Sequence, residues 1–124
     1  MAAEVQIDPA LAREAFCYLT TIGRVTGKPR EIEIWFGLDR ATLYMLSGGG
    51  DRSDWVRNLR HTPSVMVRIS NTTYSGQARV VDAVDEDALA RRLLVDKYRP
   101  RYSGDLTNWG STALPVAVDL APQR

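Results

Sequence analysis

The sequence predicts a small antiparallel β-barrel with helices packed on its outside, of the mainly β (α+β) class. Three observations carry this prediction. Short segments with alternating apolar residues recur along the chain, as in half-buried strands. Short turns join most neighbouring segments, which favours antiparallel pairing. The chain of 124 residues has the length of one domain, and no linker or repeat divides it, so we expect a single domain over residues 1–124.

The first half of the chain predicts one short helix and three strands. Asp8 can cap a helix and Pro9 fits its first turn, so we expect a helix from there to about Phe16. The strand prediction rests on apolar and polar residues that alternate with a period of two. The expected strands are residues 18–23, 30–38 and 41–47, with a polar loop at 24–29 and a tight turn at Asp39-Arg40.

The second half predicts two helices and three strands, which brings the totals to about three helices and about six strands. Residues 51–60 have an acidic first turn and a basic last turn, an arrangement that suits the helix dipole. Residues 85–99 form a helix with a broad apolar stripe, and Asp85 is its expected cap. The expected strands are residues 64–69, 74–84 and 114–120, with a loop at 100–111.

The composition argues against several classes of function. Lys and Arg total 16 against 15 for Asp and Glu, whereas proteins that hold nucleic acid usually carry a strong basic excess. Cys17 is the only cysteine, so we expect no thiolate zinc site and no metal site of another kind. The N-terminus lacks the features of a secretion signal, and no segment has the ~20 apolar residues of a membrane helix. We therefore expect a cytoplasmic protein.

A basic loop that contains glycine is the first candidate binding segment. Residues 20–30 combine three cations, Arg24, Lys28 and Arg30, with two glycines and three hydroxyl groups. Glycine lets backbone N–H groups approach a ligand, and arginine can bind a phosphate or carboxylate through two nitrogens. The segment therefore suits an anion, although the same composition also suits a solvated hairpin turn.

A glycine turn that leads into a helix is the second candidate segment. Residues 47–59 place backbone N–H donors at a helix N-terminus, where they point outward. Trp55 and Asn58 lie one turn apart on the same helix face. This face can contribute to a ligand site, and the alternative is that Trp55 simply packs in the core.

Together the two segments resemble one family. The pattern is Thr-Thr-x-Gly-Arg-x-Thr-Gly-x-x-Arg from residue 20, a hairpin, and then Ser-x-Gly-Gly, Trp-x-x-Asn-Leu and Pro-x-Val-x-Val. It is similar to the deazaflavin-dependent nitroreductase and quinone reductase family of actinobacteria. These are split β-barrel proteins related to pyridoxamine 5′-phosphate oxidases. The resemblance runs from about Leu19 to Val81 and resumes at residues 97–102 and 114–118.

The resemblance implies coenzyme F420, a deazaflavin that carries a phosphate and an acidic oligoglutamate tail. It implies that the loop meets the phosphate and the tail through Arg24, Thr26, Gly27, Lys28 and Arg30. It places Ser47, Gly48 and Gly49 along the tricyclic ring, Trp55 and Asn58 behind it, and Trp35 on the cofactor-facing side of its strand. On the substrate side it places Tyr98, Tyr102 and Trp109.

The implied activity is hydride transfer from F420H2 to an electron-poor small molecule, such as a quinone, a nitroaromatic or an activated enone. Tyr98 or Tyr102 would donate a proton or polarise the acceptor oxygen, with solvent as the alternative donor. Two other functions stay open: an FMN-dependent oxidoreductase on the same barrel, and a non-catalytic binder of a lipid or another cofactor. Related barrels dimerise, and the apolar strand residues Val65, Val67 and Val80 leave a homodimer open.

Three residues depart from the family pattern. Val25 stands where many members carry a second basic residue after the loop arginine. Asp51 and Asp54 add two carboxylates near the expected anion site, where they repel a phosphate if they face it. Arg52 and Arg57 are the nearest cations in the sequence that can neutralise them.

Overall fold

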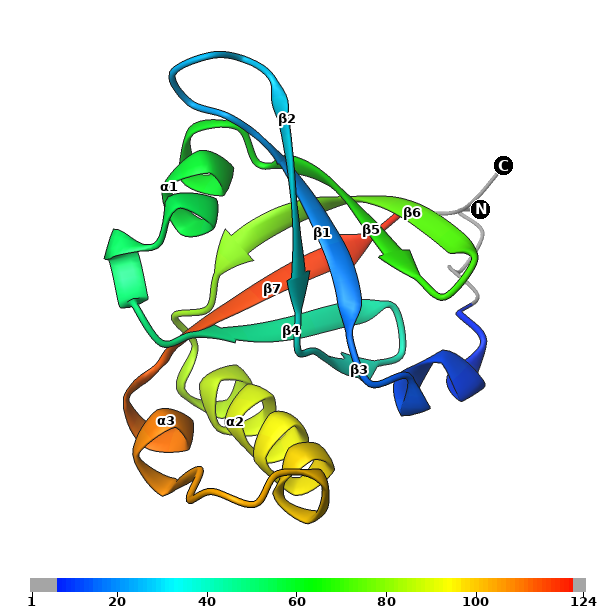
Figure 1. Ribbon diagram of the computed structural model, residues 1–124, viewed down its shortest axis with the longest axis vertical. Helices are drawn as coiled ribbons and strands as arrows, with labels where there is room; N and C mark the ends of the chain where they lie inside the picture. Colours follow the sequence, from blue (N-terminus) through cyan, green and yellow to red (C-terminus); the bar gives the residue numbers. More distant parts are fainter. Residues whose placement is uncertain (1–6, 122–124) are drawn as a thin grey trace.

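The computed structural model describes residues 7–121 and contains one antiparallel sheet of seven strands (Figure 1). The strands are β1 (Cys17–Ile22), β2 (Pro29–Ile34), β3 (Gly37–Asp39), β4 (Thr42–Ser47), β5 (Ser64–Ile69), β6 (Thr72–Val80) and β7 (Leu114–Leu120). Their order in the sheet is β2-β1-β5-β6-β7-β4-β3. The helices are α1 (Asp54–His61), α2 (Val84–Tyr98) and α3 (Thr107–Thr112). The predicted class, a mainly β barrel with helices outside, is confirmed.

The sheet curls because its two end strands are neighbours in the chain. β2 and β3 stand at opposite ends of the sheet order, yet only Trp35 and Phe36 separate them in the sequence. A step of three residues spans at most about 10 Å, so the two ends of the sheet must come together at this corner. Phe36 is fully buried inside the barrel that results.

The barrel is split between β2 and the second half of β4. Within the described residues, β2 pairs only with β1. β3 pairs with β4 only over Thr42 to Tyr44, so residues 45–47 of β4 pair with β7 alone. The edge of β2 and this part of β4 therefore leave room for side chains and ligands instead of a further backbone ladder.

The corner at Trp35 and Phe36 corrects the expected strand over residues 30–38. The structure keeps the predicted alternation: Ile32 and Ile34 pack against the barrel interior, and Trp35 packs against a second cluster outside it. An alternating pattern does not show where a strand leaves one end of a sheet and joins the other. The expected single strand is therefore two, β2 and β3.

Other boundaries also differ from expectation. β6 covers Thr72–Val80 where residues 74–84 are expected, and α1 covers Asp54–His61 where residues 51–60 are expected. The N-terminal helix is a 3₁₀ helix that covers Pro9–Arg13 and ends before Phe16, because β1 begins at Cys17. Asp8 caps it as expected, since its side chain accepts the Ala10 N–H at 2.9 Å. Ala83, not the expected Asp85, holds the cap position of α2. The expected loop at 100–111 contains α3 and a short 3₁₀ turn, Arg99–Arg101.

Two apolar clusters hold the fold together. The larger fills the barrel and includes Val65 and Val67, which are buried and do not form an exposed surface for a second copy. The smaller lies between the sheet and helices α2 and α3, which stand side by side below the sheet in Figure 1. No helix of the described residues has the length and apolar character that a membrane crossing requires.

A polar network fastens the start of α2 to the sheet. Glu86 accepts two hydrogen bonds from Arg79 at 2.6 and 2.7 Å and one from the Tyr44 hydroxyl at 2.7 Å. Arg79 also bonds Asp119 of β7 at 2.8 Å. These bonds hold the pKa of Glu86 well below its usual range, at about 2. The network fixes the helix that carries the lower cluster.

Candidate active site

Two cavities lie end to end along β2, at the split in the barrel. The first, here called the anion cavity, has a volume of about 560 Å³ and lies between the loop at 23–30 and the start of α1. The second, here called the aromatic cavity, has a volume of about 460 Å³ and lies between β2, Leu46 of β4 and the segment at 102–109. Residues 29–32 of the chain line the first cavity and residues 33–35 line the second.

The loop of the anion cavity is a tight turn that its own backbone closes. The Gly23 N–H donates to the Lys28 carbonyl at 2.8 Å, and the Gly27 N–H donates to the Gly23 carbonyl at 2.8 Å. Gly27 has a φ of +72°, a conformation that glycine adopts without strain. The Thr26 hydroxyl oxygen accepts the Lys28 N–H at 3.2 Å, and among the described residues its own proton has no acceptor, so it can reach a ligand.

Asn58 of α1 holds this loop against the barrel. Its side-chain oxygen accepts the Arg24 backbone N–H at 3.1 Å and the Arg24 guanidinium at 2.9 Å. Its side-chain nitrogen donates to the buried Thr21 hydroxyl at 3.2 Å. Asn58 is itself buried, so it positions the loop and lines the cavity at the same time.

The cations of the loop are not equivalent. Arg24 lines the anion cavity and forms an ion pair with Asp54 at 3.1 Å. Arg30 also lines the cavity but forms no ion pair with any of the described residues. Lys28 and Gly27 belong to the turn without lining the cavity. Arg30 is therefore the cation with the most freedom to bind an anion.

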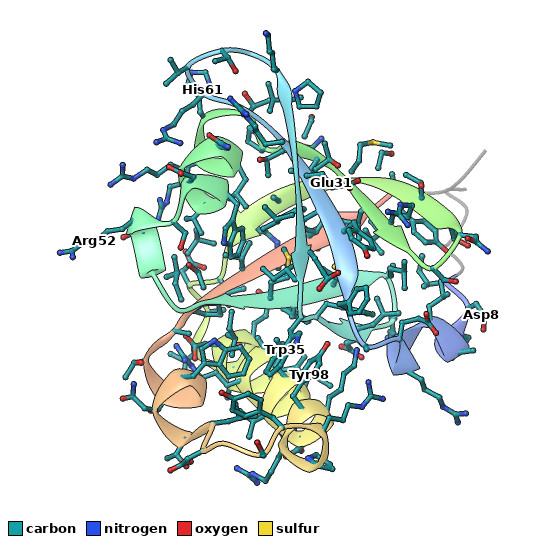
Figure 2. All side chains as sticks on the ribbon, viewed as in Figure 1. Asp8, Glu31, Trp35, Arg52, His61 and Tyr98 are labelled. Atoms are coloured by element: carbon teal, nitrogen blue, oxygen red, sulfur yellow. The ribbon has the colours of Figure 1, made fainter. Side chains whose placement is uncertain are left out.

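The partners of the two aspartates differ from those expected. Arg24 pairs with Asp54, and Arg60 pairs with Asp51 at 2.6 Å. Neither Arg52 nor Arg57 forms an ion pair with these carboxylates, and Figure 2 shows Arg52 pointing away from the barrel. Sequence neighbours on a short turn point in different directions, whereas Arg24 and Arg60 reach the carboxylates through space.

The glycine turn after β4 does not line either cavity. Ser47 is buried, and its hydroxyl lies 3.0 Å from the Gly50 carbonyl and 2.8 Å from the Ser53 hydroxyl. These contacts shape the turn between β4 and α1. Gly48 lies against the Trp109 ring, since a Cβ there would sit 3.7 Å from the Trp109 Cδ1 atom. Gly49 faces Ser53 in the same turn. Trp55, half-buried, lines the anion cavity instead.

Trp35 is the centre of the aromatic cavity. Its ring stacks on the Tyr98 ring with centroids 4.2 Å apart and an interplanar angle of 2°, and Figure 2 shows the two side by side. The rings of Tyr102 and Trp109 each meet Trp35 edge-on at 5.6 Å. Trp35, which the resemblance places on the cofactor side, lines this cavity together with Tyr102 and Trp109, which it places on the substrate side.

Tyr98 has a different place from the one expected. It is 2% exposed and does not line the aromatic cavity, because Trp35 covers its ring. Its hydroxyl accepts the Phe36 N–H at 3.0 Å and lies 2.8 Å from the Ala15 carbonyl. Burial raises the pKa of Tyr98 to about 12. Tyr98 therefore positions the corner at residues 35 and 36, and we correct the expectation that it lines the substrate side as a proton donor.

Three residues in or around the aromatic cavity were given no role by the sequence: Leu106 lines the cavity, while Gly104 and Lys97 lie next to residues that form it. Leu106 is buried beneath the cavity and comes from the segment expected to be a plain loop. Gly104 lies under the Tyr102 ring, and a Cβ there would be 2.5 Å from the Tyr102 Cε2 atom. Lys97 donates to the Phe36 carbonyl at 2.9 Å and braces the same corner from α2. Only long-range packing reveals these roles.

The structure belongs to the class of split antiparallel barrels, with a basic loop at one end of a cleft and stacked aromatic rings at the other. A family model confirms this class and narrows it. The F420H2-dependent quinone reductase family matches residues 1–121, and the chain belongs to this family. The chain is therefore an oxidoreductase of an F420-dependent family, and coenzyme F420 is the cofactor that the family name gives.

Solved structures share the fold at low sequence identity. An F420H2-dependent reductase is 20% identical with a TM-score of 0.67, over 94% of this chain and 99% of that one. A pyridoxamine 5′-phosphate oxidase-like protein of Listeria innocua is 17% identical with a TM-score of 0.61, over 92% and 88%. A structure described as a domain-swapped dimer is 22% identical with a TM-score of 0.67, over 86% and 80%.

Proposed function

We propose that the chain catalyses hydride transfer from reduced coenzyme F420 to an electron-poor planar acceptor, such as a quinone, a nitroaromatic or an activated enone. One observation carries the proposal: the anion cavity and the aromatic cavity lie end to end along β2. A cofactor with an acidic tail and a flat ring needs both environments within one cleft. The FMN-dependent and the non-catalytic alternatives become outcomes of the test below.

The donors of the anion cavity suit the phosphate and carboxylates of the cofactor. Arg30 supplies a guanidinium without an ion-pair partner among the described residues, and Thr26 supplies a hydroxyl proton. Guanidinium groups bind phosphate and carboxylate oxygens through two parallel hydrogen bonds. We propose that Arg30 and Thr26 hold the anionic part of the cofactor, with Arg24 and Lys28 beside them and Trp55 along the wall.

The aromatic cavity suits a planar acceptor. When bound, the reduced cofactor supplies a hydride, and the protein supplies position and electrostatics. Trp35 and Trp109 present apolar ring surface that can hold a flat molecule in one orientation. Holding the reactants in place removes much of the entropic barrier to their reaction.

Tyr102 is the proposed proton donor to the acceptor. Tyr102 is 48% exposed and lines the aromatic cavity, so its hydroxyl can reach both a bound acceptor and solvent. A proton delivered to the acceptor oxygen as the hydride arrives neutralises the developing negative charge. After turnover the hydroxyl recovers its proton from solvent, which its exposure allows.

The experiment that tests this function is a paired titration. Oxidised F420 and FMN are added to the purified protein in parallel, and binding is followed by quenching of the tryptophan fluorescence, which Trp55 and Trp35 report. We expect F420 to bind more tightly than FMN, and the F420H2-loaded protein to reduce a quinone or nitroaromatic. Tighter binding of FMN than of F420 would support the alternative that the protein is an FMN-dependent oxidoreductase. Tight binding without reduction of any acceptor would support the non-catalytic alternative.

We also propose that the chain forms a homodimer. The supporting observation is the similar structure described as a domain-swapped dimer. Since Val65 and Val67 are buried in the barrel, the contact would use other surfaces, such as the exposed Met66 on the outer face of β5. Light scattering on a size-exclusion column measures the mass directly. A mass of one chain over the whole concentration range would contradict a dimer.

A further inference from the structure

The anion cavity contains a carboxylate that already occupies one of its two arginines. The Asp54 carboxylate oxygen lies 3.1 Å from the Arg24 Nη2 atom, and both residues line the cavity. The Arg24 Nη1 atom donates to Asn58 at 2.9 Å. Both ends of the Arg24 guanidinium therefore have acceptors before any ligand arrives.

The charged residues that line the cavity balance one another. They are Arg24, Arg30, Glu31 and Asp54, two cations and two carboxylates. A cleft built only to attract anions would carry an excess of positive charge. Here Arg30 has no ion-pair partner among the described residues, so it can attract an anion. The positive charge of Arg24 is neutralised at close range by Asp54.

We propose that Asp54 is an affinity-determining residue that competes with the ligand anion for Arg24. The inference rests on the proposed function for the identity of the natural ligand, but its charge argument applies to any anion. An anion first meets Arg30, which has no ion-pair partner in the part of the chain that the structure describes. It reaches Arg24 only by displacing the Asp54 carboxylate, so Arg24 engages late and the cavity holds a small anion weakly.

The displacement is energetically modest because Asp54 is exposed. Its side chain is 85% accessible to solvent, so the freed carboxylate is hydrated at once. An ion pair at such a position contributes little on its own. A cofactor anchored by further contacts can therefore displace Asp54, whereas free phosphate gains too little from one additional contact.

Asp51 provides a matched control for Asp54. Asp51 is also an exposed aspartate and lies in the 3₁₀ turn Gly50–Arg52, just before α1. It pairs with Arg60 at 2.6 Å and does not line the cavity. Asp54→Asn and Asp51→Asn remove the same charge three positions apart. Long-range electrostatics are similar for the two. Only Asp54 lies in the first turn of α1, so the Arg24→Gln background is needed to separate its contact with Arg24 from its effect on the helix dipole.

The test measures dissociation constants of inorganic phosphate and of oxidised F420 for the full chain and its variants. We expect Asp54→Asn to bind phosphate about three- to fivefold more tightly, and Asp51→Asn to bind it as the unaltered protein does. The gain should shrink in about 0.5 M salt, where exposed charges are screened. Thermal unfolding of each variant confirms that it is folded.

The arginine variants test the mechanism of competition. In an Arg24→Gln background, we expect Asp54→Asn to change phosphate affinity by less than twofold, because the contested cation is absent. In the unaltered background, Arg30→Gln should weaken phosphate more than Arg24→Gln does. A gain that persists fully without Arg24 would overturn the competition and leave simple repulsion as the cause.

The outcomes separate this inference from the proposed function. If F420 does not bind but phosphate follows the expected order, the proposed function fails and the role of Asp54 stands. If phosphate binds only to Asp54→Asn, the inference is supported in its strongest form. If Asp54→Asn binds phosphate no better than Asp51→Asn does, or if neither variant binds it, the inference is overturned.

Discussion

The anion cavity and the aromatic cavity share one strand and are built by different forces. The first is shaped by hydrogen bonds and ion pairs at the surface, such as those of Arg24 with Asn58 and Asp54. The second is shaped by ring contacts around Trp35 that continue into the buried Tyr98. Ligand binding in the anion cavity should therefore respond to salt concentration and to the substitution of single charged residues. The aromatic cavity should respond to substitutions that alter the packing of its rings.

This difference has a consequence for how substitutions behave. Exposed ion pairs contribute little to folding stability, so changes in the anion cavity should alter binding and leave the fold intact. Changes to rings that belong to the core alter stability and activity together. Tyr102 is the exception in the aromatic cavity, since its ring is half exposed and belongs to neither buried cluster.

The largest expected effect is on turnover. Tyr102→Phe should lower kcat about a hundredfold if the hydroxyl donates the proton, because general acid catalysis contributes at least this much. The F420 dissociation constant should stay unchanged, since the ring and its contact with Trp35 remain. Steady-state kinetics with a quinone acceptor measures kcat. Tyr18→Phe removes a hydroxyl bonded to Glu33, which lines the same cavity, so this variant measures the effect of a lost polar contact there while the proposed donor is kept. Unchanged turnover in Tyr102→Phe would assign the proton to solvent.

The second effect is on cofactor affinity. Arg30→Ala should weaken F420 binding about ten- to hundredfold, the range expected when a charge-assisted hydrogen bond to phosphate is lost. The melting temperature should not change, because Arg30 is exposed and forms no ion pair with the described residues. Arg68→Ala removes a cation that stacks over Tyr18 and serves as the control. Equal losses in both variants would mean that net charge alone attracts the cofactor.

The third effect is on stability and comes from the buried side of the aromatic cavity. Tyr98→Phe removes the hydroxyl that accepts the Phe36 N–H and lies 2.8 Å from the Ala15 carbonyl. Buried polar groups left without partners cost about 1–3 kcal/mol, so the free energy of unfolding should fall by this amount. Urea denaturation measures the loss. The pH profile of turnover should have the same shape in Tyr98→Phe as in the unaltered protein. If an ionisation disappears from the profile of the variant, Tyr98 takes part in proton transfer.

The same contrast explains which parts of the site could be predicted. The loop at 23–30 is a continuous segment whose glycines, hydroxyls and cations lie together in the sequence. Its composition therefore favours either an anion site or a solvated turn, and the resemblance favours the anion site; Arg24, Thr26 and Arg30 do line a cavity. The aromatic cavity combines residues more than sixty positions apart, and resemblance to a family supplied Trp35, Tyr102 and Trp109.

The remaining errors have one physical origin, which is long-range packing. The alternation over residues 30–38 is a local signal, whereas the break at its centre follows from closing the sheet. Tyr98 has the same chemistry as Tyr102, and only the position of Trp35 decides which of the two meets the cavity. The partner of Asp54 is thirty residues away, beyond the reach of local charge patterns.

The smallest expected effect tests whether the aromatic half of the site loosens first in acid. Hydrogen bonds from Arg79 and Tyr44 lower the pKa of Glu86 from 4.5 to about 2. A carboxylate whose folded pKa is depressed stabilises the fold above its unfolded pKa, and this contribution is lost as the pH falls toward 2. Because Arg79 is 41% exposed, we expect a loss of only about 1 kcal/mol.

Glu86→Gln separates this contribution from general acid denaturation. The variant should be less stable than the unaltered protein at pH 6, and the difference should narrow between about pH 4.5 and 2, measured by chemical denaturation at each pH. Glu86 fastens α2, which supports Trp35 through Tyr98, so fluorescence near Trp35 should change before phosphate binding is lost. If the fluorescence near Trp35 and the phosphate binding are lost at the same pH, the two cavities unfold as one unit. The difference between a cavity shaped by surface charges and one shaped by core packing would then not appear in acid.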